Sequence, residues 1–325
     1  MTYPLYHHKP DIFKTIRDGF SHVAQNAQHV RIRHDLLAEY ARHLPVRHPA
    51  SVFDTEHHYI GAPEDTAAYV LALDAINYGS GFKDALIHEG WQPVDGSIYY
   101  AMSVRLKHQF EKAPLTAYDL AQITDERVRE ILEMPAAPQS LILSRLFAQG
   151  LRDLGHMVVS DHSACFLTFV QDADGYAANM VERLAGLPQF ADIHDYHGHQ
   201  IALYKRAQIA AADLHLAFAR LGIHLFSDMR DLTMFPDNGV PQVLSADGLM
   251  EYDAPLREMI AMGKEIPCGS DAEIEIRACA GQVVEELARL CGKTAVEVDH
   301  ILWHRHAEDS RYRNHPSHKT LCIYY

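Results

Sequence analysis

Residues 271–291, DAEIEIRACAGQVVEELARLC, give the clearest indication of how this chain folds. Their apolar side chains recur with the spacing that places them on one face of an α-helix. The residues that largely share this face are Ile274, Ile276, Val283, Val284, Leu287 and Leu290. The pattern predicts a long helix with one buried side and favours a helical fold class.

Similar patterns occupy most of the remaining chain. In residues 11–26 one apolar stripe consists of Ile12, Ile16, Phe20 and Val23. Another helix is expected from Pro63 onward, because acidic residues in a first turn are stabilised by the helix dipole. Further helices are expected at about 35–40, 99–110, 116–134, 139–155, 176–186, 204–221, 240–251, 254–262 and 294–308, and strands at about 158–159, 201–203 and 321–325. We expect one mainly α domain over residues 1–325 with at most a minor β element, in which an N-terminal helical part of about 1–150 packs on a part of about 151–325.

The charge balance bears on what the protein binds. The 325 residues include 29 Lys and Arg against 43 Asp and Glu, a formal net charge of -14. Proteins that grip a nucleic acid backbone need a basic footprint, because neutralising phosphates supplies most of their affinity. A small anion held in one pocket remains compatible with this charge. We therefore expect a free nucleotide as substrate and no direct binding of nucleic acid.

The N-terminal residues and the cysteines bear on the compartment. No run of about 18 apolar residues is present, so no transmembrane helix and no membrane partner are expected. The N-terminal stretch MTYPLYHHKPDIFKTIRDGF lacks the pattern of a secretion signal. The five cysteines are odd in number and widely spaced, which is typical of free thiols in a reducing compartment. We expect a cytoplasmic protein.

The segment YKRAQI, residues 204–209, places two adjacent cations at the start of an expected helix. A cation is not needed there to balance the helix dipole. Lys205 and Arg206 are therefore either solvated surface side chains or a pair that grips a phosphate group.

A second dense segment is FSDMRDLTMFPDNGVPQVL, residues 226–244. Asp228, Asp231 and Asp237 lie within ten residues and alternate with apolar side chains. A carboxylate in such surroundings can stabilise positive charge that develops on a ribose, or activate a water molecule. The alternative is ordinary loop chemistry, since Asp-Asn-Gly forms turns and Asp caps helices.

Four blocks together resemble the queuosine salvage family, whose members are queuosine 5'-phosphate N-glycosylases. They are YKRAQI, LTMFPDNGVPQVL, EIEIRACA and HKTLCIYY, in that order. The resemblance covers nearly the whole chain and is strongest from about residue 200 onward. It implies a mainly helical fold similar to helix-hairpin-helix DNA glycosylases, although no Leu-Pro-Gly-Val-Gly hairpin is present. It also implies hydrolysis of the N-glycosidic bond of queuosine 5'-phosphate or a related deazaguanine nucleotide, which releases queuine for salvage into tRNA.

The resemblance implies roles for individual residues. Asp237 and Lys205 are expected to be catalytic, with Lys205 acting on either the phosphate or the ribose. The expected substrate-binding residues are Tyr204, Arg206, Asp213, Asp228, Phe235, Asp74, Asn77 and Tyr78. Asp231 matches no family position and is left out of this set.

The chain departs from the family pattern after Tyr78. Gly79-Ser80-Gly81-Phe82 stands where the family has an aromatic-rich stretch that ends in Trp. In one interpretation Asn77 reads the base edge and Tyr78 or Phe82 stacks on the ring, in a pocket that the glycines make roomier or more mobile. In the other, residues 68–79 are a buried helix with its own polar contacts. The identity of the base is therefore less constrained than the reaction.

Twenty-three histidines raise the alternative of a metal-dependent phosphohydrolase. His300 and His304 would share a helix face, and His194, His197 and His199 lie close together in sequence. A metal site needs three or more converging ligands, and HxxxH here lacks the internal Glu of zinc proteases. We expect no metal and no cofactor. A non-catalytic nucleotide-binding protein is the remaining alternative.

Overall fold

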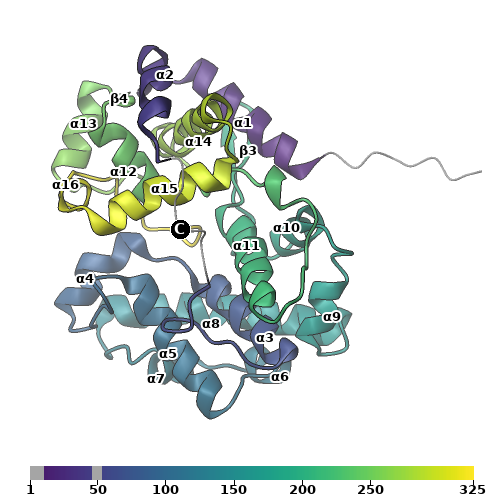
Figure 1. Cartoon of the computed structure of the whole chain (residues 1–325). Helices are drawn as coiled ribbons and strands as arrows, with labels where there is room; N and C mark the ends of the chain where they lie inside the picture. The colour runs from purple at the N-terminus through teal and green to yellow at the C-terminus, as the bar shows by residue number, and fades with distance from the viewer. Residues whose placement is uncertain (1–10, 46–52) are drawn as a thin grey trace, which may run out of the picture.

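The computed structural model describes residues 11–45 and 53–325, and in these residues the chain is mainly α-helical (Figure 1). The expected mainly α fold class is confirmed, whereas the likeness to helix-hairpin-helix DNA glycosylases stays a prediction. The described strands form two short antiparallel pairs, β1 (Val30–Ile32) with β4 (Met250–Tyr252) and β2 (Ile193–Tyr196) with β3 (His199–Ala202). The helices are α1 (Ile12–Asn26), α2 (His34–His43), α3 (Pro63–Ile76), α4 (Lys83–His88), α5 (Ile98–Lys112), α6 (Ala117–Ala121), α7 (Asp125–Ile131), α8 (Pro138–Asp161), α9 (Phe166–Gln171), α10 (Ala177–Ala185), α11 (Lys205–Arg220), α12 (Gly239–Ala246), α13 (Ala254–Ala261), α14 (Asp271–Cys291), α15 (Ala295–Glu308) and α16 (Ser310–Arg313), with 3-10 turns at Ser80–Phe82 and Met229–Asp231.

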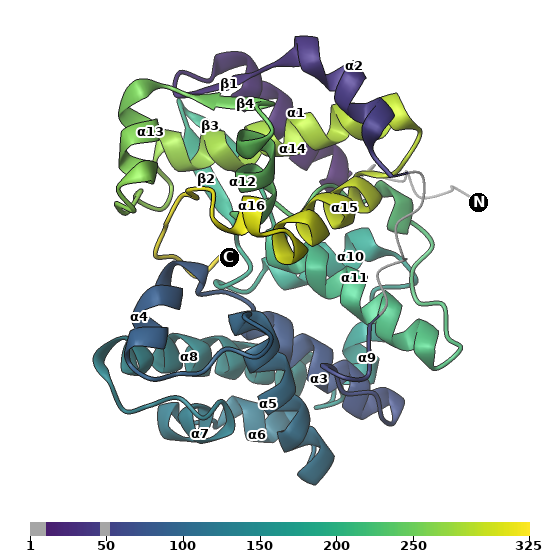
Figure 2. The ribbon, with the colours of Figure 1, turned by 60° about the vertical axis from the view of Figure 1, so that its left-hand side comes forward.

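Helix α14 is shared by two hydrophobic clusters. One cluster contains Ile274 and Ala278 together with side chains of α1, α3, α8 and α11. The other contains Ile276 and Val283 together with side chains of α2, α12, α13 and α15. The segment 271–291 is thus more deeply buried than a one-sided amphipathic helix, and it packs on both α1 and α15. Figure 2 shows α12–α16 above and α3–α9 below, with α10 and α11 between them.

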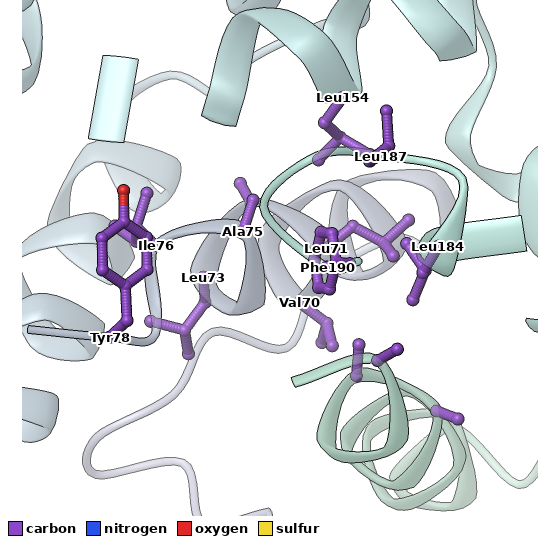
Figure 3. Packing of buried hydrophobic residues seen from close by; sticks show 14 of the residues in the cluster. Val70, Leu71, Leu73, Ala75, Ile76, Tyr78, Leu154, Leu184, Leu187 and Phe190 are labelled. Atoms are coloured by element: carbon purple, nitrogen blue, oxygen red, sulfur yellow. The ribbon is translucent and has the colours of Figure 1, made fainter. Parts of the chain in front are cut away.

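Helix α3 is buried on every side from Thr66 to Ile76. It packs against α5, α8, α9 and α11. Figure 3 shows Val70, Leu71 and Leu73 of this helix among apolar side chains from residues 154–190. Because α3 has no solvated face, any polar side chain in its last turns lies in apolar surroundings, where its protonation state depends on burial.

Several expected boundaries are wrong. Residues 158–159 belong to α8 and not to a strand, because Val158 continues the buried face of Leu151 and Leu154. The region expected to be helical at 116–134, with Thr116 and Thr124 as caps, contains two helices, and both caps are confirmed. The helix expected to reach residue 251 ends at Ala246, and residues 250–252 pair with β1. Residues 321–325 form no strand.

None of the helices in the described part of the chain is both long enough and apolar enough to cross a membrane. The first ten residues of the N-terminal stretch that was judged for a secretion signal lie outside the described residues.

Residues 318–325 lie between the upper and lower groups of helices in both views (Figures 1 and 2). They contact the glycine-containing turn that follows α3. The Gly79 backbone nitrogen, at a φ of 109°, donates to the Tyr325 oxygen at 3.2 Å. A Cβ atom at position 81 would lie 2.1 Å from the Thr320 carbonyl oxygen. The two glycines therefore permit close packing of two backbone segments. The sequence had instead suggested that they make a pocket roomier or more mobile.

We predict that Gly81→Ala lowers the free energy of unfolding by about 2 kcal/mol, because the added methyl group overlaps a backbone carbonyl. Gly19→Ala is the matched control, since its Cβ would meet Ile201 at an ordinary 3.4 Å inside a helix. Alanine is the better helix former, so this variant should be as stable as the wild type or more stable. Urea unfolding measures both, and equal stability of Gly81→Ala and wild type would contradict the packing described.

Candidate active site

The fold brings together the two segments that the sequence singled out, residues 204–209 and 226–244. Lys205 lies at the start of α11 and interacts electrostatically with Asp237, which lies just before α12. Asp74, Asp213 and Asp299 interact with the same lysine. We call these residues the lysine–aspartate cluster: Lys205, Asp74, Asp213, Asp237 and Asp299. Four carboxyl groups from α3, α11, α15 and the loop before α12 thus interact electrostatically with one ammonium group.

The position of Lys205 is fixed through its backbone. Tyr204 precedes α11 in a left-handed conformation, with φ of 46°. The Asp192 carboxylate accepts from the Lys205 backbone nitrogen at 3.3 Å, and its carbonyl accepts from Leu203 at 2.9 Å. The Lys205 residue is only 7% exposed, and burial lowers the pKa of its ammonium group while Asp237 opposes that effect. The structure therefore holds the Lys205 side chain largely away from water, within the electrostatic influence of Asp237.

Asp237 is half-buried and fixed by the helix that follows it. Its Oδ1 atom accepts from the backbone nitrogens of Gly239 at 2.9 Å and Val240 at 3.3 Å. No hydrogen bond to another described residue uses its Oδ2 atom. One oxygen therefore sets the orientation of the carboxylate at the N-terminus of α12, while the other can act on a ligand.

Arg277 connects the groups that hold Lys205 and Asp237 in place. Its guanidinium group, fully buried, pairs with Asp192 at 2.6 and 3.0 Å. Its Nε atom donates to the Pro236 carbonyl oxygen at 2.9 Å, one residue before Asp237. Burial raises the pKa of Asp192, but Arg277 and His194 outweigh it and bring that pKa to about 2. The same arginine thus holds the loop before α12 and the aspartate that anchors α11.

Asp74 and Asp213 form a second, more apolar part of the cluster. Asp74 is fully buried near the end of α3, and its Oδ1 atom accepts from the Asn77 side chain at 3.2 Å. Its Oδ2 atom has no hydrogen-bond partner among the described residues. Burial raises the pKa of Asp74 to about 7, and burial together with Asp74 raises that of Asp213 well above the ordinary value. Around neutral pH the two side chains therefore hold at least one proton between them.

Sequence reasoning missed Asp299, Arg277 and Asp192. Asp299 is buried, and its Oδ1 atom accepts from the Phe235 backbone nitrogen at 3.2 Å. Burial, followed by the nearby Asp237, raises the pKa of Asp299 well above the ordinary value. An acidic residue between Val298 and Ile301 on an apolar helix face was the available signal, because such a residue needs a buried partner.

Arg206 and Tyr78 make contacts of another kind. The Arg206 guanidinium donates to the carbonyl oxygens of Asp74 and Ala75, both at 2.9 Å, and to that of Gln189. It lies over the ring of Tyr78, with 4.6 Å to the ring centroid. Tyr78 is buried. Arg206 therefore closes the C-terminal end of α3, and a role of either side chain in substrate binding stays a prediction.

Asp228 also lies apart from the cluster. Its two carboxylate oxygens accept from the backbone nitrogens of Ala177 at 2.6 Å and Ala178 at 3.0 Å. These bonds cap the N-terminus of α10. Phe235, in contrast, lies beside Asp299, and Asn77 beside Asp74, so both adjoin the lysine–aspartate cluster.

Within the described part of the chain, the histidines of the metal alternative do not form a metal-binding group with one another. His194 bonds to Asp192 at 2.9 Å, and His197 to Asp271 at 3.2 Å. Among the described residues, neither His300 nor His304 belongs to a group of three potential ligands.

Comparisons with known proteins place these features in context. A family model described as "Queuosine salvage protein" matches residues 57–325. The chain is 34% identical over 313 residues to the queuosine 5'-phosphate N-glycosylase/hydrolase of Sphaerobacter thermophilus. The aligned region covers 93% of this chain and 95% of the relative. Proteins of the same name from Dictyostelium discoideum and Mus musculus are each 28% identical to this chain. The alignment with the first covers 95% of this chain and 98% of the relative, and the alignment with the second covers 82% and 83%.

We predict that Asp192→Asn lowers the free energy of unfolding at pH 7 by about 3 kcal/mol, because it leaves Arg277 buried without its charge partner. The pKa of Asp192 in the folded protein, about 2, lies below the ordinary 3.8, so its contribution is complete above about pH 4 and is lost as the pH falls through 2. The difference in the free energy of unfolding between variant and wild type should therefore become smaller as the pH falls from 4 to 2. Urea unfolding at several pH values tests this, with the exposed Asp195→Asn of the same hairpin as control. A gap that is independent of pH would refute the assignment.

Proposed function

The chain belongs to the queuosine salvage protein family, and on that premise we propose that it hydrolyses the N-glycosidic bond of queuosine 5'-phosphate or a related deazaguanine nucleotide. The released base is queuine, available for salvage into tRNA. The observation that supports this proposal is the placement of Lys205 beside Asp237, from segments that are distant in sequence.

Asp237 is the proposed electrostatic catalyst. Cleavage of a glycosidic bond builds positive charge on the sugar ring, and a carboxylate on the opposite face can stabilise that charge or activate the attacking water. The bonds from Gly239 and Val240 orient this carboxylate before substrate arrives. A group that needs no reorientation during the reaction lowers the barrier more than a mobile one. This supports a catalytic role for the Oδ2 atom of Asp237.

Lys205 is proposed to act at the ribose. The Asp237 carboxylate interacts with the Lys205 ammonium group and would repel a phosphate dianion placed there. A neutral ribose hydroxyl suffers no such repulsion and accepts a hydrogen bond from the ammonium group. The Arg206 guanidinium bonds to three backbone carbonyls, and its Nε atom has no partner among the described residues, so its role as a substrate ligand stays a prediction.

The remaining substrate contacts are proposed near this pair. Tyr204 adjoins Lys205, Phe235 lies close to Asp237 in the chain, and Asn77 with Asp74 offers an amide and a carboxyl group to a base edge. Asp213 supports the charge of Lys205. We further propose a free nucleotide as substrate in place of tRNA, in line with the net charge of -14, and a cytoplasmic location, in line with free cysteines.

The reaction and the role of Asp237 are tested together. Queuosine 5'-phosphate incubated with the protein should yield free queuine by mass spectrometry, whereas release of inorganic phosphate would indicate a phosphohydrolase. Asp237→Asn keeps a side chain that can cap α12 but removes the charge, so we expect kcat to fall about a hundredfold or more. Asp231→Asn, an exposed neighbour, is the control. Normal turnover by Asp237→Asn would remove Asp237 from the mechanism.

Lys205→Met, which keeps the aliphatic stem, separates the two roles of this lysine. If Lys205 acts at the ribose, kcat/KM should fall by the same factor for queuosine 5'-phosphate and for the nucleoside queuosine. If it bound the phosphate, the loss would be confined to the nucleotide. Parallel kinetics with the two substrates make the comparison, and a loss seen with the nucleotide alone would reverse our assignment.

A further inference from the structure

Two polar side chains that the proposed mechanism does not use bond to each other inside the protein. Gln208 lies in α11, one helical turn after Lys205, and Thr233 lies four residues before Asp237. Both Gln208 and Thr233 are fully buried. Residues 232–236 belong to no helix or strand, so the buried backbone nitrogen of Thr233 needs a partner from a side chain.

The hydrogen bonds between these two residues are reciprocal. The Gln208 Oε1 atom accepts from the Thr233 backbone nitrogen at 2.9 Å, and the Gln208 Nε2 atom donates to the Thr233 hydroxyl oxygen at 3.0 Å. Nε2 also donates to the Leu203 carbonyl oxygen at 3.4 Å. A backbone nitrogen can only donate and a carbonyl oxygen can only accept, so the carboxamide group has a single orientation. We call this pair of bonds the Gln208–Thr233 clamp.

The chain that follows Thr233 is held at two further points. The Phe235 backbone nitrogen donates to Asp299 at 3.2 Å, and the Pro236 carbonyl oxygen accepts from Arg277 at 2.9 Å. These partners lie in α15 and α14, whereas the clamp comes from α11. Because a close-packed interior transmits displacements, a shift at Thr233 would also move the loop before α12.

We propose that Gln208 is a positioning residue, which fixes the separation between the Lys205 ammonium group and the Asp237 carboxylate through its bonds to Thr233. This inference rests on the function proposed above, in which both groups act on one ribose. Lys205 and Gln208 are three residues apart in α11, a spacing that makes two residues neighbours on a helix surface. The clamp therefore attaches the loop to the helix next to the lysine.

The ion pair of Arg277 and Asp192 joins the same two elements at other points. Its contacts are with the Pro236 carbonyl oxygen and with the backbone nitrogen of Lys205. Two bodies attached at one point can still rotate about it, and a second attachment removes that freedom. A misplacement of about 1 Å can cost about a hundredfold in rate, so even a small rotation would slow the reaction.

The first test compares variants that remove different numbers of these bonds. Thr233→Ser, the conservative variant, keeps both bonds and should have a kcat close to that of the wild type. Thr233→Val loses the hydroxyl but keeps the backbone bond, and Gln208→Met loses both bonds at nearly constant side-chain length. We expect kcat for queuosine 5'-phosphate to fall in that order, by about tenfold or more for Gln208→Met. KM should stay unchanged, because neither buried side chain touches the substrate.

Thr66→Val is the matched control for a loss of stability. It removes a buried hydroxyl that bonds to the Gly61 backbone at the start of α3, away from the lysine–aspartate cluster. This variant should unfold at a lower urea concentration but keep the kcat of the wild type.

A second measurement does not depend on turnover. A double-mutant cycle with Lys205→Met and Asp237→Asn gives the coupling of these two residues in the free energy of unfolding. In the Gln208→Met background this coupling should fall by about a third or more, because the Coulomb interaction weakens as the two groups separate. In the Thr66→Val background it should be unchanged. If Gln208→Met does not fold, Thr233→Val replaces it in both measurements.

The outcomes separate this inference from the proposed function. A wild type that does not cleave queuosine 5'-phosphate contradicts the proposed function, and the coupling measurement then decides the role of Gln208 by itself. With an active wild type, a normal kcat in Gln208→Met, or a loss no larger than that in Thr66→Val, would overturn the positioning role. A coupling between Lys205 and Asp237 that is unchanged in Gln208→Met would also overturn it.

Discussion

The buried ion pair between Arg277 and Asp192 is the constraint on which the rest of the site depends. Neither charge can be left unpaired inside the protein without a cost of several kcal/mol, so each fixes the position of the other. Asp192 bonds to the backbone at the start of α11, and Arg277 bonds to the backbone just before α12. One interaction therefore sets the relative positions of Lys205 and Asp237, although it contacts neither side chain through a hydrogen bond.

The apolar environment of α3 gives the cluster its electrostatic character. A carboxyl group with no solvated side is costly when ionised, and that cost appears as the raised pKa of Asp74 and Asp213. Perturbed groups of this kind concentrate at functional sites, because the interactions that strain the resting protein become favourable when charge develops on a ligand. In the proposed reaction, the core of the N-terminal helices would thus contribute to chemistry as well as to stability.

Much of the fold was predictable, because the apolar residues of α1, α14 and α15 recur with the spacing of an α-helix. Blocks of local sequence also pointed to Asp237 and Lys205, which interact in the structure, while their catalytic role stays a proposal. The pairing of Arg277 with Asp192 was not predicted, although Arg277 lies in the EIEIRACA block, because the two residues are 85 positions apart. The pairing of β1 with β4 escaped for the same reason, because three-residue strands are too short to show alternation. The features that the sequence did not predict are the long-range ion pairs and the pairing of strands that are distant in sequence.

The contact of residues 320–325 with the turn at Gly79 and Gly81 has a consequence for biosynthesis. The two partners are separated by most of the described chain, so the ribosome synthesises the turn long before the segment that covers it. Contacts between residues so far apart in sequence form late in folding, because the entropy cost of closing a large loop comes before the contacts can stabilise the chain. The lower group of helices can begin to fold during translation, but the packing around Arg277 is completed only after synthesis of Tyr325. A nascent chain is therefore expected to stay inactive until that point.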